Sequence, residues 1–519
     1  MRCDRAAGLW LLLAACLAAQ GCSSATAEPE LERPPKVVAS ADELSLAQAA
    51  NREFAIELYQ QLAQERPGEN LFFSPFSISS ALLIASEGAS GETAEQMNKV
   101  LCVPAGQLAA IHKGQAAIYY RLSPEPTSPQ VREKMAQLRR DLDAANAKTK
   151  SLEQASKWDE AQQSADTATK LADELNALIK VNEPYEWRAA NALWGEQTYP
   201  FRPTYLDTIR ANYGGVVFPV DFRKNSDAAR KQINAWVEKQ TRDRIKDLLA
   251  RGTLDKDTRL VITNAVYFKG EWLQPFEQSA TKPQEFHLAD GKRISTPMMH
   301  QYTYAPSGYA AFQGDGKPFE TPHEIPFEMK DDDPSLYPDA AGFTMLELPY
   351  KGGKLAMAMI VPRSADGLAD LERKLTSGAI QNWIGGLERR TVIAYVPKFK
   401  LEAEYALEKS LQSLGMSRAF KEPGDPDGAQ LDRMTENKDP KDQLFISAVR
   451  HKTFVEVNEK GTEAAAATAV MMDAAKIRAE PPKTRPFIPT FSADKPFLFA
   501  IYDHETHSLL FLGRMVKPQ

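Results

Sequence analysis

The chain has 519 residues, of which 43% are hydrophobic and 25% charged, so a folded body is expected and a wholly disordered chain is excluded. Its 63 basic and 69 acidic residues give a formal net charge of −6. This balance excludes a general nucleic-acid binder, which would carry a basic excess, and we expect no nucleic-acid partner.

The N-terminus has the pattern of an export signal. Two arginines precede an apolar run over residues 6–19, which is too short to cross a bilayer as a helix but suits a secretory signal. Small residues then lead to Cys22, which resembles the lipobox of bacterial lipoproteins. We predict a signal peptide over residues 1–21 and a lipid anchor at Cys22. Cys16 is the alternative lipidation site, and cleavage by an ordinary signal peptidase is the other interpretation.

Such an anchor predicts an exported protein held at the outer membrane or cell surface of a bacterium, and without the anchor we expect a secreted protein. Residues 22–45 are polar and proline-containing, which is typical of a flexible tether. The other two cysteines are Cys3, within the signal, and Cys102. No Cys/His cluster occurs, so we expect no metal site and no cofactor.

The folded body is expected over residues 46–519, with two inserted segments. Residues 122–180 follow an amphipathic helical pattern, typical of one long helix or two paired helices. Residues 314–341 carry five prolines and the acidic run 331–333, and without periodicity they are predicted to be an irregular surface loop. The apolar positions of the first insertion are Val131, Met135, Leu138, Leu142, Leu171, Leu175, Leu178 and Ile179.

Strands and helices elsewhere mix without βαβ regularity, which indicates an α+β fold with a large sheet. Strands are predicted over residues 258–268, 355–361 and 392–396, and the segments 497–501 and 509–512 are predicted to form a terminal pair. No nucleophile elbow, Walker loop, dinucleotide-binding fingerprint or zinc motif occurs. We therefore expect the protein not to be an enzyme. A lipoprotein hydrolase would need a nucleophile–base pair, and the sequence shows no motif for one.

The segment over residues 451–472 carries the most information. An alternating strand pattern is broken near Gly461, and a run of alanines follows. The even-numbered positions from Thr462 to Met472 are all small or apolar, whereas Glu463 and Asp473 share the other face. Such a segment suits a strand that enters a sheet with its even face toward a core. A surface helix over 464–479 accounts for the pattern equally well, because alanine favours helices.

This segment resembles the hinge of the reactive-centre loop of serpins, which are suicide inhibitors of proteases. The resemblance extends in order through the whole body, from about residue 51 to residue 518. Its motifs are NLFFSPFSIS at 70–79, GASGET at 88–93, ANALW at 190–194, VDF at 220–222, INAWV at 233–237, NAVYFKGEW at 264–272, LELPY at 346–350, PKFK at 397–400, LGM at 414–416 and FLGR at 511–514.

The resemblance implies a serpin fold: three β-sheets, about eight or nine helices and an exposed reactive-centre loop over about 459–490. It also implies trapping of a serine or cysteine protease as an acyl-enzyme when the cleaved loop inserts into the main sheet. The alternative is a non-inhibitory serpin-fold protein with a binding or chaperone-like role. The implied shutter residues are Ser74, Ser77, Asn264 and His451. The implied hinge residues are Glu459, Gly461, Thr462, Glu463, Ala464, Ala465, Ala466, Ala467 and Thr468.

The family's usual spacing places the reactive bond seventeen residues along, counting Glu459 as the first, which gives Ala475–Lys476. A small residue there implies a target protease of elastase or subtilisin type. Arg478–Ala479 is the alternative bond and would imply a trypsin-like target. We expect the inhibitor to act as a monomer.

Overall fold

The computed structural model describes residues 34–123, 128–155, 157–182, 185–303, 307–424, 426–437, 439, 442–462 and 483–518. Both candidate lipidation sites, Cys22 and Cys16, lie outside the described residues, as do hinge positions 463–468 and the reactive-bond residues Ala475, Lys476, Arg478 and Ala479. Within the described ranges no helix is long and apolar enough to cross a membrane.

The first helix, α1 (Ala41–Glu65), begins within the segment predicted to be the tether. Ser40 and Glu43 form a capping box, with the Glu43 N–H donating to Ser40 Oγ at 3.2 Å and the Ser40 N–H donating to Glu43 Oε2 at 2.8 Å. Residues 41–45, which we assigned to the tether, therefore belong to the folded body.

Helix α2 (Pro75–Glu87) is buried along almost its whole length. Proline occupies its first turn, the Ser74 side chain caps it, and every residue from Pro75 to Ser86 is buried. It contacts strands of two different sheets, which explains why no face of it is polar. The remaining helices outside the first insertion are α3 (Gly91–Val100), α4 (Leu108–Leu122), α7 (Pro203–Tyr213), α8 (Phe222–Gln240), α9 (Leu368–Lys374), α10 (Ser377–Gly385) and α11 (Glu408–Ser413).

The first insertion is a helical hairpin, as the periodicity predicted. It consists of α5 (Pro129–Gln154) and α6 (Trp158–Asn182), which pack through their own hydrophobic cluster. The Tyr185 hydroxyl donates to the Leu122 carbonyl at 3.0 Å and joins the two ends of the insertion. With this hairpin the described residues contain eleven α-helices, so nine lie outside the insertion, in line with the eight or nine that the resemblance implied. The cluster consists of Met135, Leu138 and Leu175, with Val131, Leu142, Leu171 and Leu178 packed against them.

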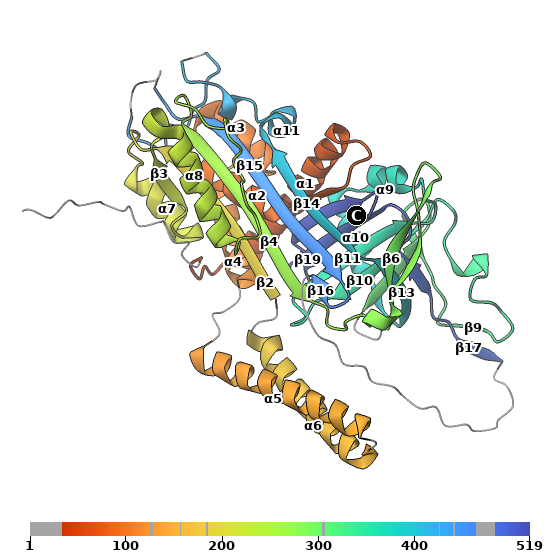
Figure 1. Cartoon of the computed structure of the whole chain (residues 1–519). Coiled ribbons are helices and arrows are strands. Elements are labelled where there is room, and N and C mark those ends of the chain that lie inside the picture. The colour runs from red at the N-terminus through yellow and green to blue at the C-terminus, as the bar shows by residue number, and fades with distance from the viewer. Residues whose placement is uncertain are drawn as a thin grey trace, which may run out of the picture. The chain divides into compact units, whose positions relative to one another are not determined.

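The six-stranded main sheet has the order β14-β15-β16-β4-β2-β3. Its two long central strands, β15 and β4, are parallel neighbours and run side by side in Figure 1. Helix α8 covers one face, where Trp236 packs edge-on against Trp194 of β2 with ring centroids 5.3 Å apart. The strands are β14 (Phe399–Ala406), β15 (Ile446–Asn458), β16 (Gly461–Thr462), β4 (Leu260–Glu271), β2 (Tyr185–Glu196) and β3 (Val217–Val220).

Two further sheets complete the body, and they contain the other strands that the sequence predicted. The eight-stranded sheet has the order β1-β20-β19-β11-β10-β7-β12 with β8 paired to β7, and the four-stranded sheet has the order β18-β13-β6-β5. The strands of the first are β1 (Leu71–Phe73), β20 (Leu509–Met515), β19 (Phe497–Asp503), β11 (Leu355–Pro362), β10 (Phe343–Pro349), β7 (Gly308–Phe312), β12 (Glu388–Arg389) and β8 (Pro318–Phe319); those of the second are β18 (Thr490–Ser492), β13 (Val392–Pro397), β6 (Arg293–Thr303) and β5 (Lys282–His287).

Residues 314–341 are mostly irregular, as predicted, but three short elements interrupt them. The segment contains β8, a short 3₁₀ turn at Pro334–Leu336 and β9 (Glu324–Pro326), which the sequence did not predict. Strand β9 pairs with β17 (Thr484–Pro486) in a two-stranded sheet, which is a fourth sheet beyond the three expected. The strands are too short to show an alternating pattern, and their partner lies more than a hundred residues away in the chain.

Candidate functional site

The junction between β15 and β4 is the candidate functional site. The two strands pair in parallel from Ile446↔Leu260 to Phe454↔Tyr267. Beyond that point the short strand β16 lies between them, antiparallel to both, with Thr462 in register with Val457 on one side and Gly270 on the other. The junction is thus closed along most of its length and already occupied by a third strand at one end.

The backbone before β16 is fixed by hydrogen bonds to the segment that follows β4. The Trp272 N–H donates to the Lys460 carbonyl at 2.9 Å, and the Trp272 indole donates to the Asn458 carbonyl at 3.0 Å. Gly461 has φ 144°, and a Cβ there would lie 2.1 Å from the Gly270 carbonyl oxygen. Only glycine fits at this position, which explains the break in the strand pattern.

Glu459 holds this end of the loop through an ion pair in which its own side chain is buried. That side chain is 7% exposed, its carboxylate lies 2.9 Å from Lys398 Nζ, and the Thr281 hydroxyl donates to it at 2.9 Å. Burial alone would raise the pKa of Glu459, but the hydrogen bonds from Lys398 and Thr281 and the Lys398 charge together lower it below the usual value of 4.5. The carboxylate therefore stays ionised and attached to Lys398, the residue before β14.

A row of buried polar side chains crosses the junction in its closed part. Asn191 of β2, Asn264 of β4 and His451 of β15 stand side by side in register. Asn264 Nδ2 donates to Asn191 Oδ1 at 2.6 Å and to Ser77 Oγ at 2.8 Å, and its Oδ1 accepts from His451 Nδ1. The Ser77 hydroxyl donates to Asn191 Oδ1 at 2.7 Å, so α2 is tied to the same row.

His451 is held neutral in this row. Its Nε2 accepts the Ser74 backbone N–H at 3.0 Å, while its Nδ1 is committed to Asn264. A second ring proton would face the Ser74 N–H, and the ring is fully buried. Burial lowers the pKa of His451 from 6.5 to about 3.

The structure thus brings together Ser74, Ser77, Asn264 and His451, the four residues that the resemblance implied for one cluster, and adds Asn191 to them. Sequence reasoning missed Asn191, although an asparagine inside an apolar strand is itself a sign of a buried polar contact. Of the implied hinge residues the structure describes Glu459, Gly461 and the Thr462 backbone.

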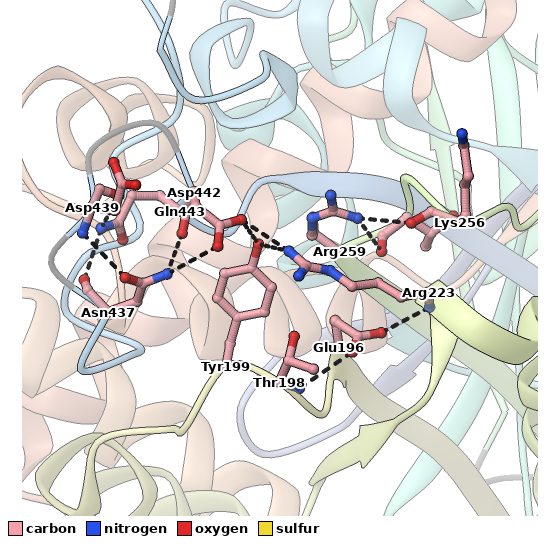
Figure 2. A network of polar contacts seen from close by, with 11 residues as sticks. Glu196, Thr198, Tyr199, Arg223, Lys256, Arg259, Asn437, Asp439, Asp442 and Gln443 are labelled. Carbon is pink, nitrogen blue, oxygen red and sulfur yellow. Dashed lines mark hydrogen bonds and ion pairs between the residues drawn. The ribbon is translucent and has the colours of Figure 1, made fainter.

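The other end of the junction is tied by a second polar network, shown in Figure 2. Glu196, the last residue of β2, is fully buried and accepts the Phe222 and Arg223 backbone N–H groups at the start of α8, at 2.7 and 3.1 Å. The Arg223 guanidinium contacts Asp442 at 2.9 Å and the Tyr199 hydroxyl at 2.8 Å, and Tyr199 also donates to Asp442. This network fixes the chain just before β15.

A direct contact joins the two strands at this end, since the Arg259 N–H donates to Ser447 Oγ at 3.0 Å. The junction is therefore bonded from both sides where β15 and β4 begin and open to a third strand where they end. Sequence reasoning missed this network because its residues come from four separate segments with no shared local pattern.

Comparisons with known proteins point to one family. The family model described as serpin (serine protease inhibitor) matches residues 49–518. The chain is 34% identical over 471 residues to an uncharacterised serpin-like protein of Thermococcus kodakarensis, covering 91% of this chain and 85% of that protein. It is 33% identical over 477 residues to a leukocyte elastase inhibitor of Bos taurus, covering 91% and 99%.

Solved structures agree in fold. Uncleaved ovalbumin matches with a TM-score of 0.64 and 25% identity, covering 91% of this chain and 100% of ovalbumin. Human thyroxine-binding globulin complexed with thyroxine matches with a TM-score of 0.63 and 24% identity, covering 92% and 100%. The second likeness supports the fold alone.

The neutral state of His451 predicts a pH dependence of stability. The unfolded chain binds a proton at this histidine below about pH 6.5, and the folded chain does so only near pH 3. The contribution of His451 is therefore fully present above pH 6.5 and is lost as the pH falls toward 3. Between pH 7 and pH 5 we expect it to cost the folded state about 2 kcal/mol.

The measurement is urea unfolding of the wild type and of His451→Gln at both pH values. The variant should be less stable at pH 7 but should lose about 2 kcal/mol less on acidification. An identical pH dependence in the two proteins would contradict a neutral buried His451.

Proposed function

This chain belongs to the serpin family, and on that premise we propose that it inhibits serine proteases by trapping them. The protease nucleophile attacks the reactive bond of the loop and forms an acyl-enzyme with the residue before that bond. The loop's N-terminal half then enters the junction between β15 and β4 and carries the bound protease with it. Inhibition results when this insertion is faster than hydrolysis of the acyl-enzyme by water. The protein needs no catalytic residues or cofactor of its own.

The observation that carries the proposal is β16, which already occupies the open end of the junction. Its register with β4 pairs Thr462 with Gly270 and Gly461 with Glu271. Continued without a break, the same register would place residue 472 opposite Leu260, the first residue of β4. The loop's N-terminal half therefore has the length to fill the junction from end to end, and the bond Ala475–Lys476 follows shortly after.

The same register predicts which residues of β4 and β15 each face of the inserted segment would contact. Residues opposite one another share a face, so even-numbered loop residues would face the side of Phe268, Val266 and Ile262, which are all fully buried. Residue 468 would stand between Asn264 and His451, separating the two and offering them a threonine hydroxyl. Glu463 would stand opposite Lys269 on the other face.

The target class follows from the residue before the reactive bond. We propose Ala475, hence a protease of elastase or subtilisin type with a shallow primary pocket. A relative named leukocyte elastase inhibitor supports an elastase-type target. Cleavage after Arg478 would make the target trypsin-like, and each residue added before the bond would lengthen the tether on the protease.

The second candidate function is binding without inhibition. The serpin fold by itself does not require inhibition, since thyroxine-binding globulin shares the fold and its solved structure is a complex with thyroxine. The hinge of this chain argues against a non-inhibitory role, because residues 464–467 are alanines and the even face carries no charge that would resist burial.

We further propose that the inhibitor is a monomer exported to the outer membrane or cell surface on a lipid anchor at Cys22, or at Cys16, joined through the tether. Secretion is the alternative.

The direct test is incubation with elastase, subtilisin and trypsin, followed by denaturing gel electrophoresis. We expect a complex that survives denaturation, and mass spectrometry should show a released C-terminal fragment that begins at Lys476. A fragment that begins at Ala479 would move the reactive bond to Arg478. Loop cleavage by all three proteases without any stable complex would refute inhibition and favour the binding role.

The face assignment predicts different effects at two adjacent residues. Ala464→Arg would place a charge opposite Phe268 and Val455, which are buried, once the loop has inserted, and an unpaired buried charge costs several kcal/mol. We expect this variant to be cleaved at the normal rate but to form at least about tenfold less stable complex. The matched control is Glu463→Arg, whose side chain belongs to the other face. Equal losses in the two variants would contradict the register.

The anchor predicts that Cys22→Ala moves the protein from the membrane fraction to the soluble fraction, because the thioether-linked lipid is lost. Cys16→Ala is the control and should leave the protein in the membrane fraction. The reverse result would assign the anchor to Cys16, and soluble wild type would indicate an ordinary signal peptide.

A further inference from the structure

The C-terminal end of the reactive-centre loop, residues 483–487, is attached to the second insertion. Strand β17 pairs with β9 in the register Thr484↔Pro326 and Pro486↔Glu324. The ladder extends at both ends, since the Phe327 N–H donates to the Lys483 carbonyl at 3.1 Å and the Phe487 N–H donates to the His323 carbonyl at 2.9 Å. Every residue from 483 to 487 is thereby aligned with the insertion.

Side chains reinforce this pairing. Phe487 is 3% exposed and packs with Ile325 and Leu336 in a small hydrophobic cluster of their own. The Arg485 guanidinium donates to Asp331 Oδ1 at 2.7 Å and to the Met329 carbonyl at 2.7 Å. The acidic run at residues 331–333, to which the sequence analysis assigned no role, thus supplies an ion-pair partner for the loop's C-terminal segment.

Arg390 fastens both pieces to the body. It lies between β12 and β13, is 8% exposed, and donates from Nη2 to the Phe487 carbonyl at 3.1 Å. The same guanidinium donates to the Pro322 carbonyl at 2.9 Å and to the Thr321 carbonyl at 3.1 Å. One buried cation therefore joins the insertion, the loop's end and the four-stranded sheet.

We propose that residues 320–337 together with Arg390 form a clamp that holds residues 483–487 and prevents the loop from completing its insertion until it has been cut. This inference rests on the proposed insertion of the loop. The clamp acts on the uncut chain, because after cleavage the inserting half is no longer connected to residue 483.

The length of the uncut chain determines whether the loop can complete its insertion. In the proposed register the strand from Thr462 to Met472 would be about 33 Å long. An uncut chain would then have to turn at the far end of the junction and return from Met472 to Lys483, which is eleven residue steps. A tight turn uses about three of these steps, and the remaining eight reach at most about 28 Å. The return is too short while the clamp holds.

When the clamp is released, the uncut chain becomes long enough to make the return. The next fixed point would be Thr490, where β18 pairs with β13. The return from Met472 then has eighteen steps, and after the turn about fifteen steps reach about 50 Å. In Figure 1, β9 and β17 lie beyond the end of the main sheet that carries β16, so the return must cover the full length of the inserted strand.

The test follows the uncut full chain during incubation at physiological temperature. Arg485→Ala and Phe487→Ala weaken the clamp, and Lys317→Ala is the matched control because Lys317 pairs with Asp315 outside it. We expect the two clamp variants to convert, without cleavage, to a form with a raised Tm and a protease-resistant loop. Conversion should be at least about tenfold faster than in the wild type and in the control.

A second variant leaves the clamp intact and tests the length argument alone. A Gly/Ser segment as long as residues 484–490 is inserted after Arg478, and the same segment inserted after Gly291, in the β5–β6 turn, is the control. The first variant should convert as fast as the clamp variants and the second should not. A stable, unconverted chain with the lengthened loop would overturn the proposal. The readout is the Tm of uncut protein, so it does not depend on finding the target protease.

Discussion

The parallel pairing of β15 and β4 is the constraint on which the rest of the molecule depends. Neighbouring parallel strands form a slightly less stable ladder per residue than antiparallel ones, and these two have no direct connection. An antiparallel strand placed between them would replace one parallel ladder with two antiparallel ladders. Under the proposed insertion the sheet would reach a more stable arrangement, and the polar row around Asn264 and the contacts at both strand ends would have to rearrange before it did so.

The two ends of the reactive-centre loop are held by different interactions, an ion pair at one end and hydrogen bonds from a guanidinium to backbone carbonyls at the other. Glu459 is attached to Lys398 at one end, and Arg390 holds the backbone around Phe487 at the other. Both attachments use a charged group in a largely dry environment, where a hydrogen bond to a charge is strong and its loss is costly. The proposed function needs the segment between them to move by tens of ångströms while both ends stay in place, and these buried charges meet that need.

The sequence predicted those features whose signal is local. The apolar spacing of residues 131–142 predicted a packed hairpin, and the ordered motifs predicted the family and the sheets. It did not predict β9 and β17, which are three residues each and depend on Phe487 packing against Ile325. Asn191 and the Glu196–Asp442 network were missed for the same reason, since their partners lie on strands whose register no local pattern reveals. The Ser40–Glu43 capping box was a local signal that the sequence analysis overlooked.

The eight-stranded sheet also imposes an order on biosynthesis. Within the part of the chain that the structure describes, β1 near the N-terminus pairs with β20, one of the last segments to be made. Leu71, Phe72 and Phe73 must wait for that partner while the ribosome completes the chain. Until β17 emerges and pairs with β9, the C-terminal end of the reactive-centre loop has no attachment that could keep it out of the junction. A chain that leaves the ribosome slowly near its end would therefore face the choice between its two arrangements before it is finished.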